Sequence, residues 1–169
     1  ALSRIAAEFS DFAKLPEPKE ELIDLKELIK NVVEFNKHNE ANTKIIVHPY
    51  AGTDIPIIKA DHDQLVRVFN NLIKNAIQAI PEEWEGLIEI RLEQTEKYYL
   101  VYIKDNGAGI PEPMKDKIFT PRFTTKSTGT GLGLAMCKNI MTNLGGEIGF
   151  DSAPNQGTVF YLMLPKNKD

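Results

Sequence analysis

The sequence predicts an α/β fold, a two-layer sandwich in which helices cover one face of a mixed β-sheet. Three observations support this prediction. Apolar residues recur at helical spacing in several stretches, and short apolar segments bounded by turn residues lie between them. The chain has no internal repeats, and its 169 residues fit one domain with an appendage.

The first fifteen residues predict a helix with one narrow apolar stripe, made by Leu2, Ile5, Ala6, Phe9, Phe12 and Ala13. Pro16 and Pro18 end it, so we expect a linker over residues 16–23 and the main domain over residues 24–166. A helix this short needs a partner to bury its stripe. The linker favours a bundle with another chain or a segment outside this sequence, and folding back onto the domain is the alternative.

Two capped helices are predicted to cover the sheet. Asp24 caps the first, and Glu27 is placed to complete a capping box. Asp61 with Gln64 opens the second, which stops near Pro81. The predicted buried faces are Leu25, Leu28, Ile29, Val32 and Val33, then Leu65, Val68, Phe69, Leu72, Ile73, Ala76 and Ile77.

Six strands complete the predicted sandwich, at residues 44–47, 55–60, 87–93, 98–105, 147–150 and 158–164. The third and fourth form a hairpin. Residues 111–129 contain two prolines and many Thr and Lys residues, and we expect a mostly mobile loop there. A fourth helix follows and ends at Gly145 and Gly146.

Composition excludes several classes of function. The formal charge of −4 gives no basic excess, so we expect no nucleic-acid partner. The single cysteine, Cys137, excludes an internal disulfide, fits a reducing cytosol and is expected to be a buried, inert thiol. No apolar run is long enough to cross a membrane. We therefore expect a cytoplasmic chain without membrane contact; its start inside a helical pattern indicates a piece of a larger protein, whose membrane anchoring stays open.

Residues 124–134, T-T-K-S-T-G-T-G-L-G-L, combine alternating glycines with the start of an apolar helix. Alternating glycines let backbone N–H groups turn inward, and a helix start adds further free N–H groups and the positive end of its dipole. This run would cradle phosphate oxygens. A glycine-rich helix cap without a ligand is an equal alternative.

Asn71 and Asn75 lie one turn apart at the edge of an apolar helical face. A carboxamide oxygen can bind Mg²⁺, a hard cation that also holds nucleotide phosphates. Lys74 and Gln78 flank the same edge and are candidates to contact phosphate. Two solvated amides are the alternative interpretation.

The run Asp105-Asn106-Gly107-Ala108-Gly109-Ile110 directly follows a predicted strand. A carboxylate there can accept a hydrogen bond from the exocyclic amine of adenine, which would select ATP over GTP. A hairpin turn is the alternative, weakened because no strand pattern follows. The P-loop, dinucleotide-binding and Ser/Thr kinase motifs are absent.

Taken in order, these elements resemble the N, G1, F and G2 boxes of sensor histidine kinases: N-N-L-I-K-N-A, D-N-G-A-G-I, I-F-T-P-R-F-T-T-K and G-T-G-L-G-L. A later glycine box, G-G-E-I-G-F-D-S with Gln156-Gly157-Thr158, extends the resemblance over nearly all of residues 24–165. The first helix resembles the end of the dimerisation bundle of nitrogen-regulation-type kinases. The resemblance implies the Bergerat fold with Mg²⁺ and ATP as ligands.

The resemblance also implies roles for residues of this chain. Asn75 would be the main Mg²⁺ ligand and Asn71 would support the metal and phosphates, with Asp105 on the adenine amine. The other implied nucleotide contacts are Lys74, Gln78, Gly107, Gly109, Ile110, Lys126, Gly129, Thr130, Gly131, Leu132, Gly133, Leu134 and Thr158. Asn71, Lys74, Asn75 and Lys126 would act in catalysis.

The implied activity is transfer of the ATP γ-phosphate to a histidine on a dimerisation helix, for relay to a response-regulator aspartate. The implied partners are a second copy, through the helical bundle, and a receiver domain. His38, His48 and His62 lack the context of a phosphoacceptor, so this chain should not phosphorylate itself.

Two alternatives to a histidine kinase stay open. ATP hydrolases of the same fold carry a glutamate four residues before the metal-binding asparagine, and Asn71 stands at that position here. An amide cannot take a proton from water, so hydrolysis is disfavoured. A nucleotide-gated interaction module is the other alternative, although all the nucleotide boxes look intact.

Overall fold

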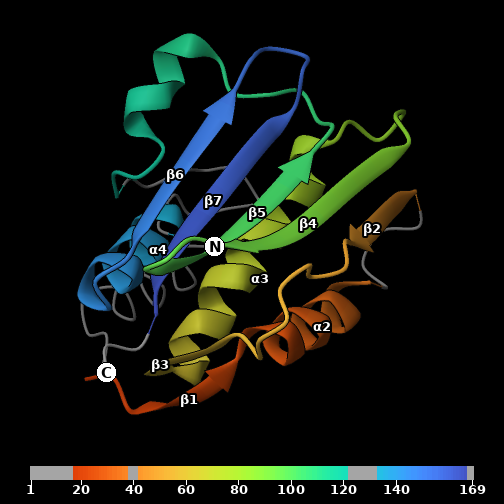
Figure 1. The fold of residues 1–169 in the computed structure, drawn as a ribbon. Helices are drawn as coiled ribbons and strands as arrows, with labels where there is room; N and C mark the ends of the chain where they lie inside the picture. Colours follow the sequence, from red (N-terminus) through yellow and green to blue (C-terminus); the bar gives the residue numbers. More distant parts are fainter. Residues whose placement is uncertain (1–16, 38–41, 122–132, 167–169) are drawn as a thin grey trace.

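The computed structural model describes residues 17–37, 42–121 and 133–166 (Figure 1). Its main sheet has the strand order β2 (Thr43–Val47), β4 (Gly86–Gln94), β5 (Tyr98–Asp105), β7 (Thr158–Pro165) and β6 (Glu147–Ser152). β2 is parallel to β4, and the other neighbours are antiparallel. The sheet is therefore mixed, as predicted.

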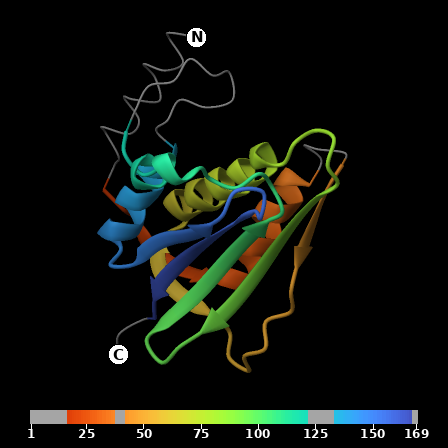
Figure 2. The same cartoon turned by 90° about the horizontal axis from the view of Figure 1, so that it is seen from above.

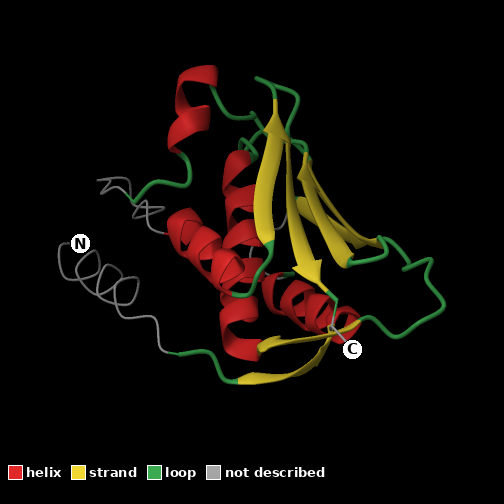
Figure 3. Cartoon of the chain, turned by 60° about the vertical axis from the view of Figure 1, so that its left-hand side comes forward, coloured by secondary structure: helices red, strands yellow, loops and turns green. Residues whose placement is uncertain are grey.

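Three helices of the described chain cover one face of this sheet: α2 (Leu25–Asn36), α3 (His62–Ala79) and α4 (Gly133–Asn143). Figures 2 and 3 show the two layers, helices on one side and strands on the other. The strands alternate, so Ile88, Ile90 and Leu92 of β4 point into the core while Glu89, Arg91 and Glu93 point away from it. The predicted two-layer α/β sandwich is confirmed.

Both predicted helix caps are present. The Asp24 carboxylate accepts the Lys26 N–H at 2.9 Å, and the Asp61 carboxylate accepts the Gln64 N–H at 3.0 Å. α3 ends at Ala79, two residues before Pro81. The buried faces of α2 and α3 agree with the predicted ones, except that Asn36 is also buried and Ile77 is only partly buried.

Residues 20–23, which we expected in a linker, belong to strand β1 (Glu20–Asp24). β1 pairs antiparallel with β3 (Ile57–Asp61) in a separate two-stranded sheet beside α2 and α3. The sequence did not predict this strand because its residues show no apolar alternation: Glu20 and Glu21 are charged, and only Ile23 is buried. The strand is held by main-chain pairing, which leaves no side-chain pattern.

The segment expected to be mostly loop contains a short 3₁₀ helix, η1 (Glu112–Lys117). Residues 122–129 of that segment lie outside the described part of the chain, as does the predicted first helix at residues 1–15. Cys137 is fully buried, as expected, and burial raises the pKa of its thiol to about 12. Among the described helices, none has the length and apolar character needed to span a bilayer.

Candidate functional site

Residues 105–110, the end of β5 and the loop that follows it, are anchored on α3 and β4. The Ala108 N–H donates to the Ala79 carbonyl at the end of α3, at 2.9 Å. The Asn106 side chain accepts the Leu87 N–H at 2.8 Å and donates to the Glu85 carbonyl at 2.9 Å. Because donors and acceptors are used on both elements, the loop has one position relative to the helix and the sheet.

The same loop is joined to the turn between β6 and β7. The Asn155 N–H donates to the Ala108 carbonyl at 2.6 Å, and the Ile110 N–H donates to Ser152 Oγ at 2.8 Å. Gly109 has a φ of +79°, and a β-carbon there would collide with the Ala153 carbonyl oxygen. The turn and the loop therefore pack backbone to backbone, which only a glycine allows at this position.

Asp105 ends β5 with a buried carboxylate, 3% exposed. It accepts the Gly107 N–H at 2.8 Å and is also hydrogen-bonded to the Thr158 backbone. Burial raises its pKa, and the two backbone bonds oppose that shift. A carboxylate has about four acceptor positions, so Asp105 can accept further hydrogen bonds from a ligand.

Thr158 stands directly beside Asp105, because the two residues are cross-strand partners in β7 and β5. Its side chain is also buried, and its hydroxyl lies 2.8 Å from Ser152 Oγ. The structure thus brings together the predicted residues Asp105, Gly109, Ile110 and Thr158 at one end of α3.

Asn71 and Asn75 lie farther along the same helix, at the edge between its buried and exposed faces. The Asn71 Nδ2 donates to the Arg67 carbonyl at 2.9 Å, while a β-carbon on Gly133 would collide with Asn71 Oδ1. The amide oxygen is therefore directed at the start of α4. Asn75 is half-buried and lies one turn before Ala79, between the α4 start and the loop of Asp105.

Three other predicted site residues lie on the helices α3 and α4. Lys74 and Gln78 are exposed on α3, and Leu134 is half-buried in the first turn of α4. Lys126, Gly129, Thr130, Gly131 and Leu132 lie outside the described residues. Phe119 is partly buried and packs edge-on against Phe150 and Phe160, with ring centroids 5.8 and 6.4 Å away, so its ring lies against the hydrophobic core.

Side chains of the described residues supply no group of three or more His, Cys, Asp or Glu that could hold a metal ion. An ion near α3 would depend on amide oxygens, with ligand phosphates and water completing its shell. Asn71 fits that use, since its amide nitrogen is tied back to the helix and its oxygen is presented to α4.

Sequence reasoning missed four contributors to this site: Ala79, Asn106, Ser152 and Asn155. Ala79 and Asn155 act through backbone groups, for which side-chain patterns give no signal. Asn106 lay within a recognised motif, but its role is to fix the start of β4. Ser152 is the last residue of the recognised run G-G-E-I-G-F-D-S, but no chemical role was predicted for it.

Comparisons with known protein families give a clear match. The model of the family described as histidine kinase-, DNA gyrase B-, and HSP90-like ATPase matches residues 60–168. Sporulation kinase A of Bacillus subtilis is 37% identical to this chain and sensor histidine kinase ZraS of Escherichia coli is 36% identical. Each alignment covers 98% of this chain but 28% and 35% of those proteins, so the chain spans about a third of their length.

Solved structures agree with this match. The nucleotide-free catalytic domain of histidine kinase ThkA has a TM-score of 0.77 at 33% identity, covering 89% of this chain and 99% of that domain. ThkA in complex with the response regulator TrrA has a TM-score of 0.79 at 29% identity, covering 98% of this chain and 48% of that one. With the fold, the ordered motifs and the relatives in agreement, the chain belongs to the histidine kinase-, DNA gyrase B- and HSP90-like ATPase family, as a catalytic ATP-binding domain of the sensor histidine kinase type.

Proposed function

We propose that this domain binds Mg²⁺ and ATP along α3 and directs the γ-phosphate to a histidine on a dimerisation helix outside this sequence. The phosphoryl group would then pass to the aspartate of a response regulator. One observation carries the proposal: the buried acceptor Asp105 is followed by a loop that packs on the end of α3, and the amide oxygen of Asn71 on that helix is directed at the start of α4. The first suits an adenine amine and the second suits a cation that holds phosphate.

The family resemblance supplies the roles proposed along α3. Asn75 is the main Mg²⁺ ligand and Asn71 supports the metal and the phosphates, which the ion would neutralise during transfer. Lys74 and Gln78 reach the phosphates from the exposed side. Lys126 and the glycine run at residues 129–133 are proposed to close over the triphosphate, where backbone N–H groups can hold anionic oxygens.

Hydrolysis of ATP is the competing reaction, and Asn71 argues against it. Activation of water needs a group that takes a proton, and an amide has no such capacity. The proposed phosphoryl transfer asks only for positioning and charge neutralisation from this domain. The solved complex of the histidine kinase ThkA with its response regulator matches 98% of this chain. This likeness supports a receiver domain as the later partner.

A titration with Mg-ATP and Mg-GTP, with phosphate release followed in the same samples, tests the proposal. We expect saturable ATP binding, much weaker GTP binding and negligible release. Steady release would move the assignment to a hydrolase. Absence of ATP binding would leave an interaction module and overturn the proposal.

Asn75→Ala tests the metal assignment, with Asn70→Ala as its matched control. Asn75→Ala should abolish the Mg²⁺ dependence of ATP binding. Asn70 is on the same helix but faces α2, where its Oδ1 accepts the Asn36 Nδ2 at 2.8 Å. Asn70→Ala should therefore lower stability and leave the Mg²⁺ dependence intact; unchanged Mg²⁺ dependence in Asn75→Ala would reject the assignment.

A further inference from the structure

A row of three polar side chains crosses the end of the sheet beside the loop of Asp105. Asp105, Thr158 and Ser152 are successive cross-strand partners on β5, β7 and β6, so their side chains project from the same face. All three are buried, at 3%, 4% and 7% exposure. Asp105 and Thr158 belong to the proposed nucleotide site, whereas Ser152 has no assigned role.

The three hydrogen bonds of Ser152 determine which group donates and which accepts in each of them. Its Oγ lies 2.8 Å from the Ile110 nitrogen, 3.1 Å from the Gly157 carbonyl oxygen and 2.8 Å from Thr158 Oγ1. A serine hydroxyl donates one hydrogen bond and accepts two. The Ile110 N–H can only donate and the Gly157 carbonyl can only accept, so the Ser152 proton points to Gly157. Thr158 must then donate its proton to Ser152.

This arrangement decides what Thr158 offers to a ligand. With its proton directed at Ser152, the Thr158 oxygen presents only lone pairs to the site, next to the carboxylate of Asp105. Two neighbouring acceptors suit an amino group, which carries two protons, and disfavour a carbonyl oxygen at the same place. An unmade or repulsive contact in a buried site costs far more than one in water.

We propose that Ser152 is a specificity-determining positioning residue, which holds the Thr158 hydroxyl as an acceptor and so makes the site select a 6-amino purine over a 6-oxo purine. The proposal rests on the proposed function, because it concerns the base end of the same site. Ser152 acts through Thr158 and through the Ile110 N–H, without contact to the nucleotide.

The test measures the affinities of the whole chain for ADP and for inosine diphosphate by calorimetric titration. Inosine diphosphate carries a carbonyl in place of the 6-amino group. The wild type should prefer ADP. In Ser152→Ala the Thr158 proton is released and can turn toward the carbonyl, so inosine diphosphate binding should strengthen and the preference for ADP should fall by about tenfold. General loosening of the site would weaken both ligands and cannot strengthen one.

Three variants separate the proposed role from a structural one. Ser152→Thr keeps the hydroxyl and should restore the preference. In a Thr158→Val background, Ser152→Ala should cause no further change in the preference, since the coupled hydroxyl is gone. Ile148→Ala, on the same strand, should lower stability and leave the preference unchanged. If Ser152→Ala fails to fold by circular dichroism, Ser152→Cys, a weak acceptor of similar size, should lower the preference in the same direction.

The outcomes are distinguishable. Equal losses for both nucleotides in Ser152→Ala, an unchanged preference, or the same shift in Ile148→Ala would overturn the role of Ser152 while nucleotide binding stands. A wild-type chain that binds neither diphosphate would overturn the proposed function itself, and the role of Ser152 with it.

Discussion

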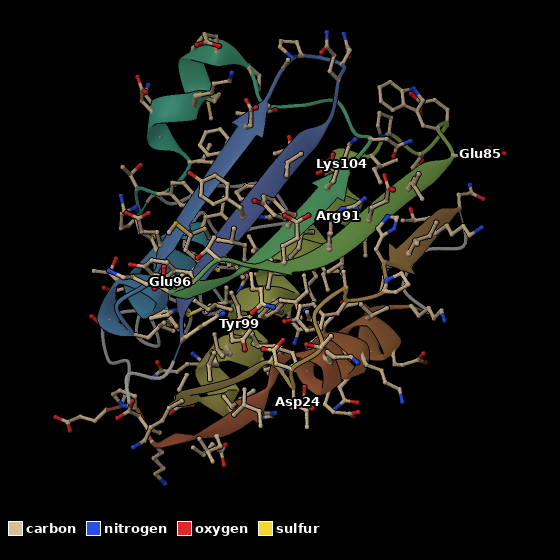
Figure 4. All side chains as sticks on the ribbon, in the orientation of Figure 1. Asp24, Glu85, Arg91, Glu96, Tyr99 and Lys104 are labelled. Atoms are coloured by element: carbon tan, nitrogen blue, oxygen red, sulfur yellow. The ribbon has the colours of Figure 1, made fainter. Side chains whose placement is uncertain are left out.

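Two aspartates lie near opposite ends of β5, and their surroundings shift their pKa values in opposite directions. Asp105 ends the strand in a buried position, and burial raises its pKa. Asp54 lies in the exposed loop before β3 and accepts the hydroxyls of Tyr50 at 2.6 Å and Tyr99 at 2.5 Å. Those two bonds lower the pKa of Asp54 to about 2. Figure 4 labels Tyr99 near the start of β5 and Lys104 near its end.

The difference shows which property marks a carboxylate that is available to a ligand. Asp54 also accepts the Gln94 amide at 3.2 Å, so donors of the protein use much of its capacity and it ties the loop to the β4–β5 hairpin. Asp105 receives backbone bonds only and keeps spare acceptor positions in a buried site. A shifted pKa is common to both, but Asp105 keeps more unused acceptor positions than Asp54 and keeps them in a buried site.

Among the substitutions that test this difference between the two aspartates, Asp105→Asn is expected to have the largest effect on nucleotide binding. The amide loses one acceptor and places a donor toward the adenine amine, so ADP affinity should fall by about 100-fold. Because the raised pKa of Asp105 means that its charge is disfavoured in the folded protein, the neutral variant should be at least as stable at pH 7. Calorimetric titration and thermal unfolding measure the two quantities.

Asp151→Asn is the control for this prediction, since it removes an exposed carboxylate from β6. It should leave both binding and stability close to those of the wild type. Full ADP affinity in Asp105→Asn would mean that the base does not use this carboxylate, and the contrast between the two aspartates would lose its functional meaning.

The second effect concerns the backbone around Asp105, tested by two glycines with nearly the same φ. Gly109 has φ +79° and no room for a β-carbon against Ala153, so Gly109→Ala should cost about 3 kcal/mol or more and displace the loop. Gly145, in the turn after α4, has φ +83°, but the nearest atom to a β-carbon would be Pro165 Cγ at 3.9 Å. Gly145→Ala should cost only about 1 kcal/mol, the strain of its backbone.

Urea unfolding and ADP titration of both variants check this prediction. We expect Gly109→Ala to lose nucleotide binding and Gly145→Ala to keep it. Similar stability losses in the two variants would show that the turn between β6 and β7 yields easily, in which case the base end of the site is not rigidly held.

Much of the fold was predictable because it depends on side-chain patterns. Asp24 and Asp61 predict the starts of two helices because their carboxylates can cap them. Alternating apolar residues predict the strands of the main sheet. Strand β1 escaped prediction because its residues Glu20 and Glu21 give no apolar alternation and its stability comes from main-chain pairing with β3. The 3₁₀ helix η1 escaped because it has no buried face.

The candidate site was predictable where chemistry lies in side chains at a fixed spacing. Asn71 and Asn75 share a helix edge, and Asp105 ends a strand, so all three could be found. The contacts that fix the site's shape come from the Ala79 carbonyl, the Asn155 N–H and the hydroxyl of Ser152, whose partners are 29, 47 and 42 residues away in the chain. Such pairings appear only once the strand register is known.

The smallest effect is expected at the other aspartate. Asp54→Asn removes the acceptor shared by Tyr50 and Tyr99, and should lower the melting temperature slightly at pH 7 while leaving ADP binding unchanged. The pKa of Asp54 is lowered from 3.8 to about 2, so its stabilising effect is present above pH 3.8 and is lost as pH falls toward 2. The pKa of Tyr99 is raised by burial and by Asp54 from 10.0 to about 12, so its effect is present below pH 10.0 and is lost as pH rises toward 12.

The difference in melting temperature between the wild type and Asp54→Asn should therefore be greatest between about pH 4 and pH 10 and should shrink on both sides. Glu96→Gln, which removes an exposed carboxylate at the nearby hairpin turn labelled in Figure 4, should give no such pH dependence. A difference that stays constant from pH 2 to pH 12 would mean that ionisation of Asp54 and Tyr99 contributes nothing to holding the loop. In that case the lowered pKa of Asp54 would carry no structural consequence, and the loop would depend on packing of the Tyr50 and Tyr99 rings instead.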